Sequence, residues 1–106
     1  MKGGKSINHH ELTQMLNNDS AVVLDIRDKK EFSAGHIAGA VNVPFSKLSA
    51  PTAELDAHKE KMIVVVDKQG QHSGSAGRTL SKLGYQVNRL NGGMMMWTSE
   101  KLPVIK

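Results

Sequence analysis

The residues with the clearest capacity for chemistry lie in one short stretch that begins at Asp67. Residues 63–66, just before it, are four branched apolar residues without alternation, a pattern typical of a strand covered on both faces, as in a parallel sheet. Gly70 permits a tight or left-handed turn, and Ser73 or Ser75 can cap a helix that starts there. The stretch therefore predicts a buried strand, a loop and the start of a helix.

A junction of this kind directs backbone N–H groups and the positive end of a helix dipole into one small bowl. The bowl favours an anion or a nucleophile at its base, and the residue at the base is Asp67. Its carboxylate is expected to supply one fixed negative charge and to accept charge-assisted hydrogen bonds from the loop amides. The predicted anion-binding loop consists of Asp67, Lys68, Gln69, Gly70, Gln71, His72 and Ser73.

Other polar side chains are expected to support this loop. His72 has the residue type of a general base, but the sequence fixes no orienting acid beside it, so we interpret it as an anion-binding side chain. Lys68 is expected on the loop rim as a solvated cation. Asp25 and Arg27 follow another apolar run, and we predict that they form a buried or half-buried ion pair that supports the pocket.

Use of Asp67 as a nucleophile for phosphoryl transfer is an alternative. Phosphatases that form an aspartyl phosphate carry a second carboxylate two residues later, and that position is Gln69 here. No cluster of metal ligands accompanies Asp67 in the sequence, and the adjacent His9 and His10 cannot face one metal ion from a helix. We therefore disfavour this alternative and predict neither a metal site nor a cofactor.

The composition is that of an ordinary globular domain. Of 106 residues, 39% are hydrophobic and 23% are charged, so we predict one domain over residues 1–106, with residues 1–5 as a flexible lead-in. The net charge of +4 comes from scattered Lys and Arg with only 4% aromatic residues, which disfavours nucleic acid as a partner. Cysteine is absent, which excludes disulfides and thiol nucleophiles. No apolar run has the length of a membrane span, and we expect a cytoplasmic location.

Strand-like and helix-like patterns alternate along the whole chain. Strands are predicted at residues 21–24, 40–43, 62–66 and 85–90. Helices or helical turns are predicted at residues 8–16, 28–35, 45–48, 53–58 and 73–84, and from residue 94 to before Pro103. This alternation predicts an α/β fold of three layers, a parallel central sheet with helices on both faces. Ligands are expected beyond the carboxyl ends of the strands, where Asp67 lies.

Local side-chain signals refine this assignment. Asn8 with Glu11 predicts a capping box at the first helix. Asp28 is expected to cap the second helix, with Phe32 facing inward. Methionines 94–96 are expected mostly to fill the core, with one of them pointing outward as a soft contact surface.

Four segments, in this order, make the chain similar to a known family. Residues 25–27 (DIR) match D-x-R, and residues 35–44 (GHIAGAVNVP) match GHI-x-GA-x-N-x-P. Residues 67–73 (DKQGQHS) align with C-x-x-G-x-R-S, and residues 92–97 (GGMMMW) match GG-x-x-x-W. The chain resembles a single-domain rhodanese-like (sulfurtransferase) domain over nearly its whole length, and the resemblance implies the three-layer rhodanese-like fold.

The resemblance also implies what the chain has lost. In active members the first loop residue is a cysteine, which takes the outer sulfur of a donor such as thiosulfate and carries it as a persulfide. Here Asp67 stands at that position and His72 stands at the Arg position. A carboxylate cannot hold sulfane sulfur, because the reaction needs a polarisable thiolate. No catalytic residue is therefore expected, and His36 is expected to be a turn residue that hydrogen-bonds locally.

The favoured function is a catalytically inactive rhodanese-like domain that binds an anion or a protein partner. The small anion would be one such as thiosulfate, and the protein partner would be linked to sulfur trafficking by family analogy. The alternative is a sulfurtransferase-class enzyme that depends on a thiol from its partner. Some relatives carry an upstream membrane anchor, so tethering through a segment outside this sequence is the alternative to a free cytoplasmic domain.

Overall fold

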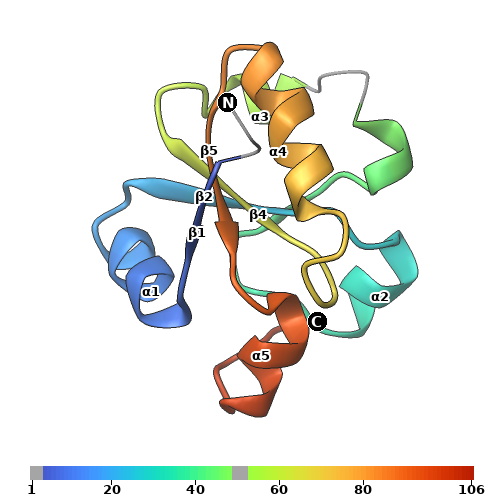
Figure 1. Cartoon of the computed structure of the whole chain (residues 1–106). Helices are drawn as coiled ribbons and strands as arrows, with labels where there is room; N and C mark the ends of the chain where they lie inside the picture. The colour runs from blue at the N-terminus through green and yellow to red at the C-terminus, as the bar shows by residue number, and fades with distance from the viewer. Residues whose placement is uncertain (1–3, 49–52) are drawn as a thin grey trace.

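Five parallel strands form one sheet in the described part of the chain, which comprises residues 4–48 and 53–106 of this computed structural model (Figure 1). The strands are β1 (Lys5–Ile7), β2 (Ala21–Asp25), β3 (Val41–Asn42), β4 (Met62–Val66) and β5 (Gln86–Leu90). Their order across the sheet is β1-β5-β4-β2-β3, and every pairing is parallel. The helices are α1 (His9–Asn17), α2 (Lys29–Ala34), η1 (Phe45–Lys47), α3 (Ala53–Asp56), α4 (Ser73–Lys82) and α5 (Gly93–Ser99).

Strand β4 is the centre of the sheet and carries apolar side chains on both of its faces. Ile63 and Val65 pack into one hydrophobic cluster, and Val64 and Val66 pack into the other. All four are fully buried, because β2 and β5 cover the two edges of β4 and helices cover both faces. The prediction of a strand covered on both faces is confirmed, and its last residue places Asp67 at the carboxyl edge of the sheet.

Helices form the outer two layers. Ala76 and Leu80 of α4, with Leu55 of α3, pack in the same cluster as Ile63. Leu12 of α1 and Trp97 of α5 pack in the opposite cluster. In Figure 1, α3 and α4 accordingly lie together at one side of the sheet, and α1 and α5 lie at the other. The predicted three-layer α/β fold is confirmed. Among the described helices, none has both the length and the apolar character needed to cross a lipid bilayer.

The first strand corrects the predicted lead-in. Lys5 pairs with Asn88 and Ile7 pairs with Leu90, so β1 extends the sheet beyond β5. A side chain at Gly4 would come within 2.4 Å of the Val87 carbonyl oxygen, which shows how closely the chain approaches β5. Residues 1–3 lie outside the described residues. The strand was not predicted because it is a short edge strand with one buried side chain, and so it carries no alternation to detect.

Helix caps follow the sequence signals only in part. The capping box at α1 is confirmed: the Glu11 amide donates to Asn8 Oδ1 at 2.9 Å, and the Asn8 amide donates to Glu11 Oε1 at 3.2 Å. The cap predicted at α2 is wrong, because the Asp28 side chain makes no capping hydrogen bond. Phe32 is only half-buried; its ring stacks on the His36 ring at 3.7 Å instead of entering the core.

The predicted serine caps of α4 are also wrong. The N-cap position is His72, whose side chain forms no capping hydrogen bond. Ser73 is buried as the first helical residue, and its hydroxyl donates backward to the Gly70 carbonyl at 3.1 Å. The serine therefore closes the preceding loop and does not cap the helix.

Candidate functional site

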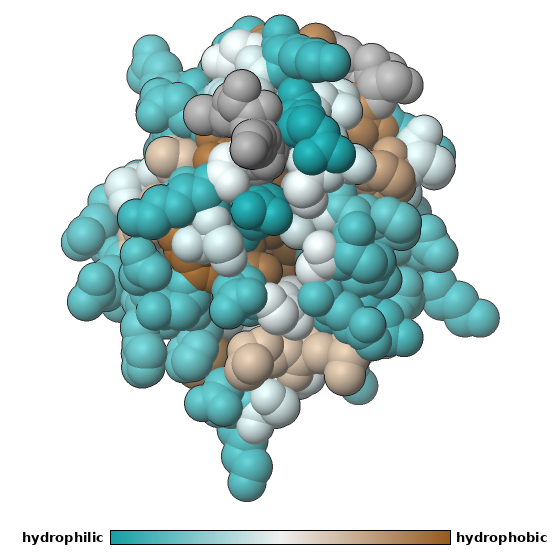
Figure 2. All heavy atoms as spheres, in the orientation of Figure 1, coloured by the Kyte–Doolittle hydropathy of each residue, from teal (hydrophilic) through white to brown (hydrophobic). Residues whose placement is uncertain are grey.

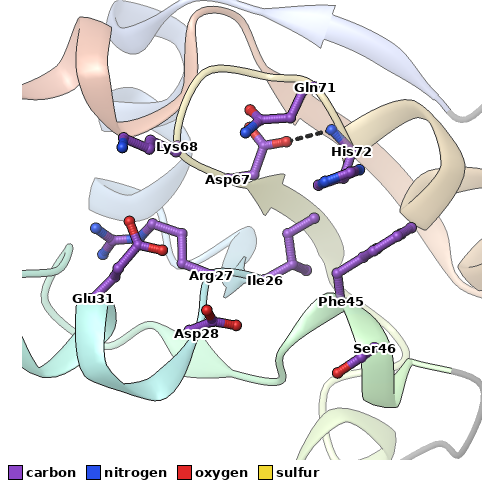
Figure 3. A pocket seen from close by; sticks show the side chains of 10 residues that line it. All are labelled: Ile26, Arg27, Asp28, Glu31, Phe45, Ser46, Asp67, Lys68, Gln71 and His72. Carbon is purple, nitrogen blue, oxygen red and sulfur yellow. Dashed lines mark hydrogen bonds between the residues drawn. The ribbon is translucent and has the colours of Figure 1, made fainter.

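A pocket of about 280 Å³ opens at the carboxyl ends of β2 and β4 (Figure 3). One wall comes from the segment between β2 and α2 together with α2, another from η1, and the third from the loop between β4 and α4. The residues that line it are Ile26, Arg27, Asp28, Glu31, Phe45, Ser46, Asp67, Lys68, Gln71 and His72. The predicted loop thus lies at the edge of the sheet where ligands of parallel α/β folds bind.

Asp67 closes its own loop. Its side chain is 3% exposed, Oδ1 accepts a hydrogen bond from the Gly70 amide, and Oδ2 accepts one from the His72 amide at 2.7 Å. In Figure 3 the carboxylate points up into the turn of the loop, away from the open pocket. Gln71 adds a third internal contact, because its Oε1 accepts the Gln69 amide at 3.0 Å. The expected bonds from loop amides to the carboxylate are therefore present, and an internal anion occupies the bowl.

Helix α5 fixes the other side of the same loop. The Met94 amide donates to the Asp67 carbonyl at 2.8 Å, and the Met95 amide donates to the Lys68 carbonyl at 2.9 Å. Gly93 has φ +58°, and a Cβ there would lie 2.5 Å from the Asp67 carbonyl oxygen. Only glycine fits at this contact between helix and loop. Sequence reasoning did not foresee this contact, although the two adjacent glycines before the helix were its signal.

The predicted ion pair between Asp25 and Arg27 is confirmed. Asp25 is 1% exposed and receives Arg27 Nη2 at 2.8 Å and Arg27 Nε at 3.0 Å, which is a bidentate arrangement. Arg27 Nη2 also donates to the Gly35 carbonyl at 2.8 Å, so the pair joins the end of β2 to the end of α2. The Asn42 side chain donates to the carbonyls of both Asp25 and Arg27 at 2.9 Å, a link across strands that was not predicted.

His72 and Lys68 lie on opposite sides of the pocket (Figure 3). The exposed His72 ring stacks on the Phe45 ring, with the centroids 4.6 Å apart and the planes 11° from parallel. In residues 4–48 and 53–106, no carboxylate is hydrogen-bonded to the His72 ring, so nothing there orients it as a general base. The sequence could not indicate the stack, because Phe45 and His72 come from distant parts of the chain.

The His36 side chain bonds locally, as the resemblance implied, because Nδ1 contacts the Phe32 carbonyl oxygen at 2.8 Å. The His36 backbone pairs with the distant Ile105. The His9 and His10 rings lie 4.4 Å apart on α1. Over the part of the chain that the structure describes, no three side chains of His, Asp or Glu gather as a metal site would require.

Comparison with known proteins gives a consistent set of relatives. The sequence profile of the Rhodanese-like domain matches residues 8–100. The uncharacterized protein YibN of Escherichia coli strain K12 is 38% identical over 104 residues, which cover 96% of this chain and 73% of YibN. YrkF of Bacillus subtilis, a candidate sulfur carrier protein, is 31% identical over 84 residues, which cover 78% of this chain and 44% of YrkF.

Solved structures match over nearly the full length. A rhodanese-related protein from Thermoplasma volcanium superposes with a TM-score of 0.83 and 31% identity, covering 95% of this chain and 97% of the other. The human single-domain sulfurtransferase superposes with a TM-score of 0.79 over 92% of this chain and 97% of its own. Its identity of 24% supports likeness of fold alone.

Proposed function

This chain belongs to the rhodanese-like domain family, and we propose that it is a catalytically inactive member that binds a partner protein with the face around the Asp67 loop. The proposal rests on the position of the Asp67 carboxylate, which accepts hydrogen bonds from the Gly70 and His72 amides inside the loop. An oxygen acceptor stands where sulfur transfer needs a thiolate, and the sequence contains no cysteine to replace it.

The internal carboxylate also disfavours a small anion such as thiosulfate as the resident ligand. Two unit charges of the same sign about 4 Å apart repel by about 4 kcal/mol at an effective dielectric constant near 20. The two amides that would stabilise an incoming anion already donate to Asp67. Within the predicted choice between an anion and a protein, these facts favour the protein.

An apolar surface beside the loop supports a protein partner. Met95 is 52% exposed and Met96 is 42% exposed, so two of the three methionines point outward, and the prediction of one is corrected. With Gln69, Gly92 and Ser99 they line a shallow hollow of about 410 Å³. Figure 2 shows pale brown atoms over α5 in a surface that is otherwise mostly teal. Exposed methionines adapt to varied partner surfaces.

The biological setting is part of the proposal. The name of YrkF, which is 31% identical to this chain over 84 residues, describes a candidate sulfur carrier. By analogy we place the partner of this chain among proteins that carry or transfer sulfur, and we place the complex in the reducing cytoplasm, which suits a cysteine-free chain.

The test is incubation with thiosulfate and cyanide, followed by measurement of thiocyanate. We expect the chain alone to form no thiocyanate above a blank without protein, because it has no group that can carry the sulfur. Turnover above the blank would contradict the proposal. Thiocyanate that forms only when a thiol-bearing protein is added would instead support the alternative, a sulfurtransferase-class enzyme that uses a partner thiol in the open pocket.

Asp67→Cys tests whether the loop keeps the geometry of an active relative. The variant contains a single cysteine, so a mass gain of one sulfur atom after thiosulfate treatment reports on this position alone. We expect partial loading, increased by His72→Arg because a guanidinium binds an oxyanion donor better than imidazole. Ser46→Cys, on the pocket wall outside the loop, is the matched control and should not load.

A further inference from the structure

The charges around the pocket have the opposite sign to the charge of the chain. Three of its lining residues are acidic: Asp28 and Glu31, whose carboxylates are exposed, and Asp67, whose carboxylate points into its own loop. Two are basic, Lys68 and Arg27, and the charge of Arg27 is balanced by the buried Asp25 at 2.8 Å. The pocket therefore has an excess of negative charge in a chain whose net charge is +4. A pocket of this sign attracts cations and repels anions.

The carboxylates of Asp28, the N-cap residue of α2, and of Glu31 in α2 are available to a ligand. Asp28 and Glu31 are exposed, and within residues 4–48 and 53–106 neither carboxylate forms an ion pair or accepts a hydrogen bond. Lys29 and Lys30 belong to the same helix, but they do not line the pocket. Lys68 is exposed on the loop rim, where its flexible chain can turn outward when a second cation enters.

The opposite wall is aromatic. Phe45 is 37% exposed, and its ring lies parallel to the His72 ring. In Figure 3 this pair stands across the pocket from Glu31, with Ile26 between them at the floor. A guanidinium suits both walls, because its planar group accepts an aromatic face and donates paired hydrogen bonds to carboxylates. A lysine ammonium can also lie over an aromatic face, but it has no planar group to stack on the ring and no paired donors for a carboxylate.

We propose that this pocket receives an arginine side chain of the partner protein, held between the carboxylates of Asp28 and Glu31 and the Phe45–His72 stack. The volume of about 280 Å³ is just below the range of small-molecule pockets, which are roughly 300 to 1,000 Å³, and suits one side chain. The inference rests on the proposed function, since it identifies the chemistry that the partner presents to the same site.

The test uses two tripeptides of nearly the same shape, acetyl-Gly-Arg-Gly-amide and its citrulline analogue, in which a neutral urea replaces the guanidinium. Each is titrated at low salt into the whole ¹⁵N-labelled chain, and the amide shifts of the loop from Lys68 to His72 are followed. We expect the arginine peptide to shift these amides saturably and to bind at least tenfold more tightly than the citrulline peptide. Equal shifts from both peptides, or no shift from the arginine peptide, would overturn the inference.

Two variants locate the interaction. The double variant Asp28→Asn, Glu31→Gln should weaken arginine binding about fivefold, the effect of removing two exposed charge interactions. Glu60→Gln removes an acidic residue near the start of β4, at the other end of the strand, and should leave binding unchanged. Binding that is insensitive to the double variant overturns the inference.

The same titration is repeated with thiosulfate as the competing ligand. If thiosulfate shifts the amides of Lys68 to His72 more strongly than the arginine peptide does, the pocket binds anions and the inference is overturned. The thiocyanate assay remains a separate readout. Failure of arginine binding removes this inference alone, whereas turnover by the chain removes the proposed function.

Discussion

Asp67 shares the charge of a thiolate but lacks its polarisability. Both carry one negative charge and accept hydrogen bonds from the surrounding amides, so either can order the loop. Only sulfur is polarisable enough to attack a sulfane sulfur and retain it. The Asp67 carboxylate accepts hydrogen bonds from the Gly70 and His72 amides and so orders the loop around an oxygen anion.

Asp67→Ala should unfold more easily and loosen the loop. It removes both acceptors from buried amides, and hydrogen bonds to a charged group contribute about 1.5–3 kcal/mol each, so we expect the free energy of unfolding to fall by about 3–6 kcal/mol. Urea denaturation measures the loss, and hydrogen exchange of the Gly70 and His72 amides measures loop order. Asp67→Asn, which retains one oxygen, should lose about half as much. An alanine variant with unchanged stability and unchanged exchange would show that the carboxylate does not organise the loop.

The local part of the site could be predicted from sequence, and the tertiary part could not. Asp67 accepts hydrogen bonds from amides that lie no more than five residues away. The sequence patterns of the strand, the loop and the helix therefore define this geometry together. The stack of Phe45 on His72 joins segments that meet only in the folded chain. The side chain of Asn42 reaches Asp25 across neighbouring strands for the same reason. Such contacts depend on packing that no local pattern encodes.

The junction between α5 and the loop makes two elements act as one unit. Two backbone hydrogen bonds join them, from the Met94 and Met95 amides to the carbonyls of Asp67 and Lys68. The helix has only seven residues, too few to be stable by itself, so it depends on this junction and on the burial of Trp97. Disturbing the start of α5 should therefore loosen the loop as well.

Gly93→Ala and Gly70→Ala distinguish the steric cost of the contact between α5 and the loop from the conformational cost of a positive φ. Both glycines have positive φ, +58° and +99°. A Cβ at Gly93 would lie 2.5 Å from the Asp67 carbonyl oxygen, whereas a Cβ at Gly70 meets nothing within 4 Å. We expect Gly70→Ala to cost about 1–2 kcal/mol for conformation alone and Gly93→Ala to cost more than about 3 kcal/mol. Thermal unfolding of both variants checks the order, and equal losses would contradict it.

Tyr85, the residue before β5, forms a second contact between elements, in this case with α3. Tyr85 is 4% exposed, and its hydroxyl donates to the Asp56 carboxylate of α3. Burial, followed by the hydrogen bond to Asp56, raises the pKa of Tyr85 to about 12. The neutral phenol is therefore the form that the fold stabilises, and the unfolded chain loses this proton at lower pH, near 10.

The stability of the chain should accordingly fall at high pH. The contribution of Tyr85 is fully present below pH about 10 and is lost as the pH rises through about 12, because the unfolded chain binds fewer protons in that range. Tyr85 is the single tyrosine, so absorbance at 295 nm titrates it directly, and urea denaturation between pH 9 and about 12 measures the loss. Tyr85→Phe should be less stable near neutral pH and should lack most of this dependence. A midpoint near pH 10 in the folded chain would contradict the assignment.

Buried helices and strands could be predicted from the sequence more readily than exposed ones. The continuous apolar run of β4 and the apolar stripe of α4 have strong sequence signals, because both elements are buried over several residues. Strand β1 has one buried residue and obtains its conformation from pairing with β5. The caps of α2 and α4 failed as predictions because the side chains had competing options: Ser73 bonds back to Gly70, and Asp28 faces the pocket.

At the scale of the molecule, exposed apolar residues flank the carboxyl edge of the sheet. Phe45 stands at the wall of the pocket, and Met95 and Met96 stand beside Gln69 on the other side of the loop. Glu31 of α2 lies across the pocket from the aromatic wall, and Asp28 precedes the same helix. A partner that inserts an arginine at the pocket would also cover the methionines, so one docking event would bury both features.

Oxidation by hydrogen peroxide tests which methionines are open in the free chain. Met95 and Met96 are 52% and 42% exposed, whereas Met94 is 4% exposed, and the three are adjacent in sequence. Because peroxide must reach the sulfur, we expect Met95 and Met96 to form sulfoxide at least tenfold faster than Met94, as measured by fragmentation of the peptide that contains all three. Met94 is an internal control that shares their local sequence. Equal rates in a chain that remains folded by circular dichroism would mean that α5 does not present this face, and the surface assigned to the partner would then be lost.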